Sequence, residues 1–140
     1  GRLMGYPMEA VFVFGSNRAG RHGAGAALHA AKHWGAEAGV GEGRTGNAYA
    51  LPTKDEQLRT LPIGEIREGL ARFFDYARGE RELFLLTPIG TGLAGIPLGV
   101  ISALLGEFAP LPGNVALTGT WIPARRRRGK GDGGAEDAAD

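Results

Sequence analysis

The sequence contains no cysteine among its 140 residues. This absence excludes disulfides, a thiolate nucleophile, iron–sulfur clusters and every cysteine-based zinc site. A metal ion would have to be held by the three histidines together with carboxylates. His29 and His33 are four residues apart, a spacing that brings two imidazoles to one face of a helix. No third ligand accompanies the pair, so the sequence predicts neither a metal site nor a bound cofactor.

Long apolar runs are missing as well. No segment approaches the roughly 20 apolar residues that a membrane-spanning helix needs, and the first residues contain no hydrophobic signal core. We therefore expect a soluble, cytoplasmic protein without a membrane partner.

Most of the chain has no excess of one charge. Residues 1–124 contain eleven basic and eleven acidic residues. A neutral body of this kind does not favour non-specific binding of nucleic acid. The chain then continues with a basic run, a Gly-rich stretch and an acidic end. The run consists of Arg125, Arg126, Arg127 and Arg128. This composition predicts a disordered, charged tail over residues 125–140, with a nucleic-acid adaptor acting through the arginines as one alternative.

The rest of the chain has the composition of a globular protein. Hydrophobic residues make up 43% and charged residues 22%. This mixture and the chain length predict one domain over residues 9–124, preceded by an extension over residues 1–8. The sequence gives no indication of an oligomeric state.

Apolar runs and amphipathic stretches alternate along the predicted domain. Strands are expected at residues 9–14, 47–52, 83–87 and 114–121, and helices at residues 23–34, 62–78 and 97–108. The strands are apolar throughout, which is typical of strands buried on both faces. The sequence therefore predicts an α/β fold, a three-layer α/β/α sandwich with a mainly parallel sheet. Residues 36–45 are expected to form a Gly-rich connection.

Two Gly-rich segments follow predicted strands and precede predicted helices, one at residues 15–27 and the other at residues 88–95. In a parallel sheet such loops meet at the carboxyl edge, where ligands bind. Glycines at a helix entrance let backbone amides approach a phosphate closely. Neither loop contains the Gly-Lys-Ser/Thr sequence of a kinase phosphate-binding loop. Neither contains the Gly-x-Gly-x-x-Gly sequence of a dehydrogenase dinucleotide-binding loop. Two phosphate-binding loops side by side favour a nucleotide diphosphate ligand.

Four segments in order resemble the macro domains, which bind ADP-ribose and related metabolites. They are Val-Phe-Val-Phe-Gly-Ser-Asn (11–17), His-Gly-Ala-Gly-Ala-Ala (22–27), Ala-Tyr-Ala-Leu-Pro-Thr-Lys (48–54) and Pro-Ile-Gly-Thr-Gly-Leu-Ala-Gly (88–95). The similarity is closest to the branch that includes the terminal ADP-ribose protein glycohydrolase and its phage and bacterial relatives. It implies a macro-like domain that takes part in ADP-ribose or NAD metabolism.

The resemblance also implies which residues bind the ligand. The first loop would surround the distal ribose and the second would wrap the diphosphate. The ligand-binding residues expected from it are Gly15, Ser16, Asn17, Gly23, Ala24, Gly25, Ala26, Gly90, Thr91, Gly92, Leu93, Ala94 and Gly95.

Two acids that macro-domain hydrolases use are replaced in this chain. Gly25 stands where one branch has an aspartate in the first loop, and Ala94 stands where the glycohydrolase branch has one in the second. A binding module is therefore the leading hypothesis. An ADP-ribosyl hydrolase or ADP-ribose phosphate phosphatase is the alternative, with His22 or Asp55 as the catalytic group, although His22 can equally bind phosphate or cap the helix.

Trp121 ends the last predicted strand. An indole at that place can stack on the base of a nucleotide, and it can equally close the hydrophobic core. The sequence leaves both interpretations open.

Overall fold

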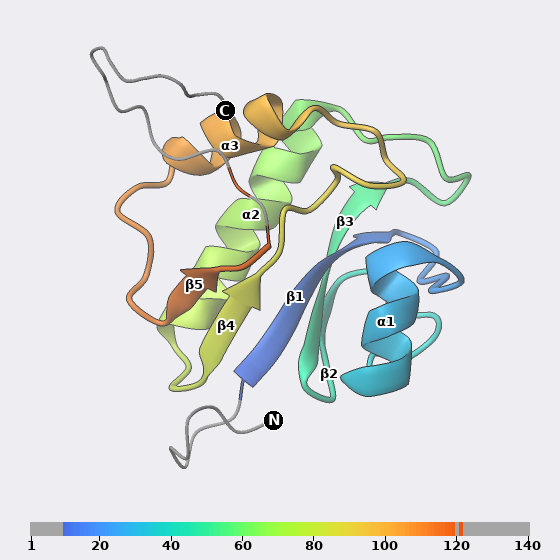
Figure 1. Ribbon diagram of the computed structural model, residues 1–140, viewed down its shortest axis with the longest axis horizontal. Helices are drawn as coiled ribbons and strands as arrows, with labels where there is room; N and C mark the ends of the chain where they lie inside the picture. Colours follow the sequence, from blue (N-terminus) through green and yellow to red (C-terminus); the bar gives the residue numbers. More distant parts are fainter. Residues whose placement is uncertain (1–9, 120, 122–140) are drawn as a thin grey trace.

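The computed structural model describes residues 10–119 and Trp121, and its elements alternate between strand and helix (Figure 1). Their order is β1 (Ala10–Asn17), α1 (Gly25–His33), β2 (Gly43–Thr45), β3 (Ala48–Lys54), α2 (Ile63–Arg78), β4 (Leu83–Leu86), α3 (Leu98–Gly106) and β5 (Val115–Leu117).

The strands form one five-stranded sheet in the order β2-β3-β1-β4-β5. β1 is central and pairs in parallel with β3 and β4, and β4 pairs in parallel with β5. Only β2 runs antiparallel, at the edge next to β3. The predicted α/β class with a mainly parallel sheet is therefore confirmed.

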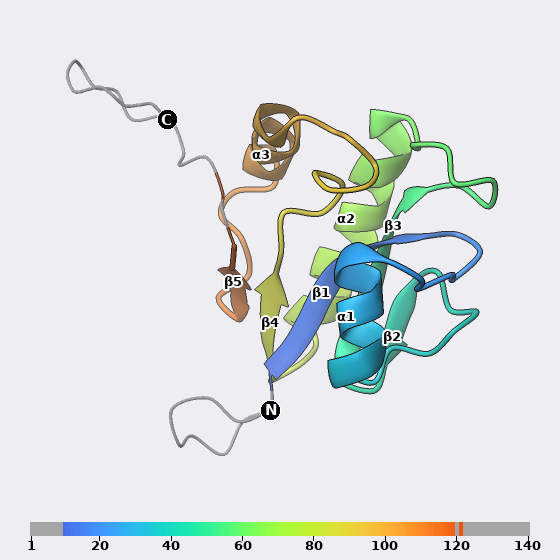
Figure 2. The same ribbon diagram turned by 45° about the vertical axis from the view of Figure 1, so that its right-hand side comes forward.

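Side chains of β1 point alternately to the two faces of the sheet, and each face has its own hydrophobic cluster. Val11 and Val13 belong to a large cluster with residues of α2 and α3. Phe12 and Phe14 belong to a smaller cluster with Ala27 and Ala30 of α1. Helix α1 thus covers one face of the sheet while α2 and α3 cover the other, as the turned view shows (Figure 2).

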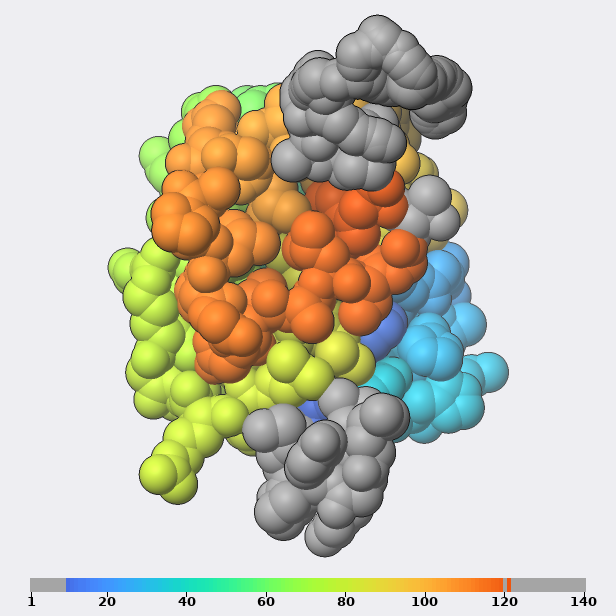
Figure 3. Space-filling view, turned by 60° about the vertical axis from the view of Figure 1, so that its left-hand side comes forward, coloured from blue at the N-terminus to red at the C-terminus, as the bar shows by residue number. Residues whose placement is uncertain are grey.

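The larger cluster contains most of the buried hydrophobic residues. In the space-filling view, α3 and β5 (orange) lie against β4 and α2 (yellow-green), with α1 (blue) on the other side (Figure 3). Helix α2 is the predicted amphipathic helix, and it buries Ile66, Leu70, Phe73, Phe74 and Ala77 in this cluster. In residues 10–119 and Trp121, no helix combines the length and the apolarity that crossing a bilayer requires.

Two sequence-based boundaries around the first loop were wrong. β1 was expected to stop at residue 14, but Gly15, Ser16 and Asn17 continue the strand because they pair with Leu51, Pro52 and Lys54 of β3. Helix α1 begins at Gly25, two residues later than expected. The first connecting loop therefore comprises residues 18–24.

The connection over residues 36–45 was also described incompletely. Its last residues, Gly43–Thr45, form β2 and pair with β3. A Gly-rich strand of three residues has no hydrophobic pattern to reveal it, and β2 exists through its pairing alone. The last strand, β5, covers only Val115–Leu117 of the expected 114–121. The predicted extension over residues 1–8 and the tail over residues 125–140, with its arginines, lie outside the described residues.

Candidate functional site

Three parallel strands bring their carboxyl ends to one edge of the sheet. β1 ends at Asn17, β3 at Lys54 and β4 at Leu86. Two connections leave this edge toward helices on opposite faces. We call residues 18–24 the first glycine loop and residues 87–97 the second glycine loop. Because β1 and β4 are neighbours, the two loops start side by side.

The end of β1 and the start of α1, on either side of the first glycine loop, both lie close to the second glycine loop. At the base, a Cβ placed on Gly15 would lie 3.1 Å from the amide nitrogen of Gly90. Further out, a Cβ placed on Gly25 would lie 3.4 Å from Cδ1 of Leu93. Leu93 is 68% exposed. The structure thus brings the start of α1 next to the tip of the second loop.

The start of α1 and the second glycine loop present backbone amides that have no acceptor among the described residues. The N-cap residue of α1, Ala24, is extended and makes no side-chain capping hydrogen bond, and the first turn of α1 holds no acidic residue. The first intrahelical donor is Leu28, whose amide donates to the Ala24 carbonyl at 3.2 Å. Within residues 10–119, the amides of Gly92, Leu93 and Ala94 also have no acceptor. Unpaired amides and a helix N-terminus attract an anion.

The second loop is held in shape by its own hydrogen bonds. The Thr91 hydroxyl donates to the Pro88 carbonyl at 2.7 Å, and the Ile96 amide donates to the Gly90 carbonyl at 2.9 Å. Gly90 and Gly95 have φ angles of 78° and 71°, where glycine is favoured. Thr91 therefore supports the turn, and the glycines permit it.

Ser16 and Asn17 are both buried, and both use their side chains within the protein. The Ser16 hydroxyl donates to the Gly41 carbonyl. The Asn17 amide nitrogen donates to the Arg21 carbonyl at 2.8 Å, and its oxygen accepts from the Arg21 amide at 3.0 Å. Asn17 therefore closes the first loop on itself. One N–H of its amide group has no acceptor among the described residues.

His22, a candidate catalytic group, is 9% exposed. Its Nε2 lies 3.0 Å from the Glu37 carbonyl oxygen, and its ring packs edge-on against Phe14 with centroids 5.4 Å apart. A carbonyl only accepts, so Nε2 carries the hydrogen of this bond. Nδ1 is buried and has no partner among the described residues.

Asp55, the second candidate catalytic group, follows β3 at the same edge of the sheet. Its Oδ1 accepts hydrogen bonds from the amides of Gln57 and Arg59 at 2.8 and 2.9 Å. These amides, that of Arg59 foremost, hold the pKa of the carboxyl below its usual value. Asp55 is therefore ionised at neutral pH and closes a turn. The turn reaches the second loop, because the Thr60 hydroxyl donates to the Ala94 carbonyl at 2.7 Å.

The first glycine loop itself carries two basic side chains, Arg18 and Arg21. Arg18 pairs with Glu65 at 2.6 Å, and Arg21 donates to the Glu56 carbonyl at 3.1 Å. Both are exposed, as is typical of solvated surface contacts.

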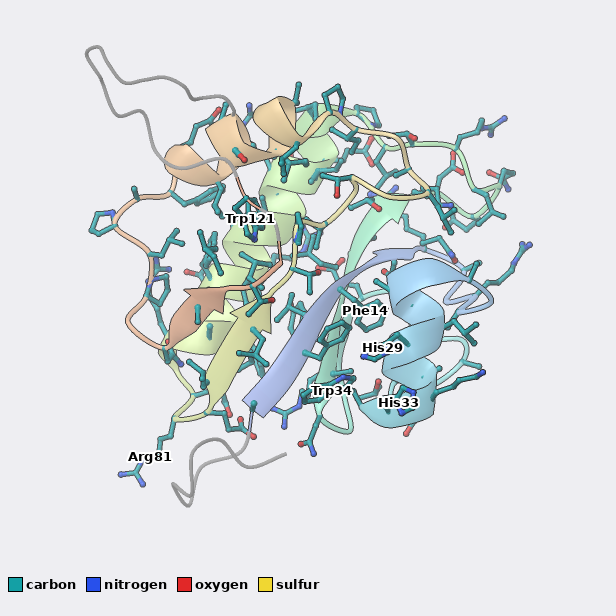
Figure 4. All side chains as sticks on the ribbon, viewed as in Figure 1. Phe14, His29, His33, Trp34, Arg81 and Trp121 are labelled. Atoms are coloured by element: carbon teal, nitrogen blue, oxygen red, sulfur yellow. The ribbon has the colours of Figure 1, made fainter. Side chains whose placement is uncertain are left out.

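The histidine pair lies on α1, away from this edge, whereas Trp121 lies beyond the end of β4, beside the start of the second glycine loop (Figure 4). The indole of Trp121 donates to the carbonyls of Thr118 and Leu86 at 2.9 and 3.3 Å and packs on the large cluster. The rings of His29 and His33 are 4.8 Å apart on α1, and Trp34 donates to Nε2 of His29 at 3.4 Å. In the described ranges, no group of three or more His, Asp or Glu side chains is arranged to hold a metal ion.

Sequence reasoning did not identify one part of the site. Residues 37–41, expected to be a plain connection, pack directly against the first glycine loop. The Gly39 amide donates to the Gly20 carbonyl at 2.9 Å. The number of glycines in this stretch was the one available signal, because only glycine allows two backbones to lie so close.

Comparisons with protein-family models, curated proteins and solved structures found no match for this chain.

Proposed function

We propose that this protein binds ADP-ribose or a related nucleotide diphosphate sugar between its two glycine loops. One observation carries the proposal. The N-terminal amides of α1 and the amides of Gly92, Leu93 and Ala94 have no acceptor in the described ranges, and Gly25 and Leu93 bring the two sets together. Two adjacent groups of free amides match the two phosphates of a diphosphate. The resemblance to macro domains supports a ribose-linked diphosphate as the ligand.

The contacts of the candidate catalytic groups favour binding over hydrolysis. His22 uses Nε2 for the Glu37 carbonyl, and the Asp55 carboxylate accepts the amides of its own turn. A general base needs a free lone pair that its substrate can reach, and the lone pair left on the His22 ring, that of Nδ1, is buried. We expect ADP-ribose to be bound and released unchanged.

Thermal unfolding of the full chain with and without ADP-ribose tests the proposal. At a ligand concentration about 100 times Kd, the stabilisation is about 2.7 kcal/mol, which gives a visible rise in Tm. ADP, NAD and ribose 5-phosphate serve as comparison ligands. A rise selective for ADP-ribose supports the proposal, and the absence of a rise with every ligand rejects it.

A charge placed between the loops gives a matched control. Gly92 has open space around its Cα and no left-handed φ angle, so a side chain fits there without strain. Gly92→Asp adds an anion near the expected diphosphate, and Gly92→Asn adds almost the same volume without charge. We expect Gly92→Asp to raise Kd for ADP-ribose at least about tenfold above that of Gly92→Asn, since like charges at close range repel. Equal affinities would place the phosphates elsewhere.

A further inference from the structure

Residues 37–41, which we call the support segment, lie directly against the first glycine loop and the end of β1. Three hydrogen bonds join them. The Gly39 amide donates to the Gly20 carbonyl, the Ser16 hydroxyl donates to the Gly41 carbonyl, and His22 Nε2 donates to the Glu37 carbonyl. These bonds connect residues far apart in the sequence. The loop is therefore supported by a second layer of backbone.

The two layers are too close to admit side chains between them. A Cβ on Gly20 would overlap the carbonyl carbon of Gly39 and the amide nitrogen of Val40. A Cβ on Gly41 would lie 2.5 Å from the Asn17 carbonyl oxygen and 2.6 Å from that of Arg18. Backbone atoms cannot move aside as a flexible side chain can. The position of the support segment therefore fixes the path of the loop.

His22 supplies the only contact of this set that comes from a side chain of the loop itself. Its ring is buried against Phe14 of β1, and its Nε2 bond reaches the first residue of the support segment. The next residue, Gly23, begins the exposed stretch that leads into the amides of α1. With Nδ1 buried and unpartnered in the described ranges, the ring is committed to this one hydrogen bond.

We propose that His22 is a positioning residue, which holds the backbone of residues 23–26 in its anion-binding arrangement by donating Nε2–H to the Glu37 carbonyl. The part of this inference that concerns ligand binding rests on the proposed function. The part that concerns the conformation of the loop does not depend on it. The residue transfers no proton to or from a substrate.

Nitrogen NMR of the wild-type protein reads the tautomer of His22 without any substitution. We expect the Nε2–H form at neutral pH, with a hydrogen-bonded Nε2 proton that exchanges slowly. An Nδ1–H tautomer, or a doubly protonated ring at neutral pH with no protected Nε2 proton, would overturn the proposal.

Two variants separate the hydrogen bond from the packing of the ring. His22→Gln places an N–H donor at nearly the position of Nε2, whereas His22→Leu keeps an apolar side chain against Phe14 and removes the donor. Hydrogen exchange of the peptide covering residues 17–26 is measured in both, with peptides from α2 as the internal reference for folding. We expect exchange in residues 17–26 to be about tenfold faster in His22→Leu and close to wild type in His22→Gln.

Binding of ADP-ribose to the same proteins completes the test. We expect Kd to rise about tenfold in His22→Leu and to recover in His22→Gln. If wild type does not bind ADP-ribose, the proposed function fails while the exchange rates still decide the role of His22. Wild-type exchange in His22→Leu, or equal loss in both variants with α2 intact, would overturn the positioning role.

Discussion

Gly90 lies where the second glycine loop turns toward the sheet. Its φ angle is 78°, and a Cβ there would lie 2.8 Å from Cδ1 of Ile96. We expect Gly90→Ala to lower the free energy of unfolding by about 1–3 kcal/mol, because the left-handed backbone opposes a side chain and the Ile96 side chain would have to shift. Gly92→Ala is the matched control, with open space and no left-handed φ. Urea denaturation measures both, and equal stability of the two variants would contradict the expectation.

Glu82 gives a residue-scale prediction for pH. Its carboxylate accepts hydrogen bonds from Arg44 at 2.8 and 3.0 Å, and this contact lowers the pKa of Glu82 below its ordinary value of 4.5. A carboxyl whose pKa is lower in the folded state stabilises the protein above its unfolded pKa. That stability is lost as the pH falls through the lower, folded value.

Unfolding experiments between pH 6 and pH 3 measure this contribution. We expect the free energy of unfolding to fall less steeply with acid in Glu82→Gln than in wild type. Asp75→Asn serves as a control, because Asp75 pairs with Arg78 on an exposed helix surface. Parallel pH profiles for wild type and Glu82→Gln would show that the pair with Arg44 adds nothing.

At the scale of elements, Asn114 joins the end of α2 to the start of β4. Its side-chain nitrogen lies 2.8 Å from the Ala77 carbonyl and 3.1 Å from those of Glu80 and Glu82. Two of these carbonyls lie at or just beyond the C-terminus of α2, where intrahelical donors run out. Asn114 therefore caps α2 from the loop that precedes β5.

Two substitutions at this position test the cap. We expect Asn114→Ala to lower the free energy of unfolding by about 1 kcal/mol through the lost hydrogen bonds. Asn114→Asp should cost more, since a carboxylate would face carbonyl oxygens without a proton to donate. Thermal and urea unfolding measure both, and an Asn114→Asp variant as stable as Asn114→Ala would argue against the cap.

At the scale of the whole molecule, the two hydrophobic clusters hold different helices against the sheet. The large one, with Phe73 at its centre, joins α2 and α3 to the sheet. The small one, with Phe14, joins α1 to the opposite face and contacts His22. Both phenylalanines are fully buried. Damage to the small cluster should therefore affect α1 and the first glycine loop, whereas the large cluster, which includes Ile89 and Ile96, supports the second glycine loop.

Phe14→Leu and Phe73→Leu make this comparison with the same change of side chain. We expect each to lower the free energy of unfolding by about 1–3 kcal/mol. Only Phe14→Leu should speed hydrogen exchange in α1, because it loosens the packing of α1 on the sheet. The same effect on α1 from Phe73→Leu would show that the two faces are not independent.

The sequence by itself determined the class of sheet and, except for β2, the kinds of element and their order. Apolar strand patterns predict burial on both faces, and the period of Ile66, Leu70, Phe73 and Phe74 predicts α2, because these signals are local. The two Gly-rich loops could be assigned to one edge because parallel strands end at the same side.

Only the tertiary structure decided how the site is built. β1 extends to Asn17 because β3 pairs with it, and β2 exists because it joins the other side of β3. The side chains of His22 and Ser16 donate hydrogen bonds to carbonyls that are 15 and 25 residues away in the sequence. No local pattern encodes such a contact. It forms only when folding brings two backbones together, and the glycines of both segments leave the space for it.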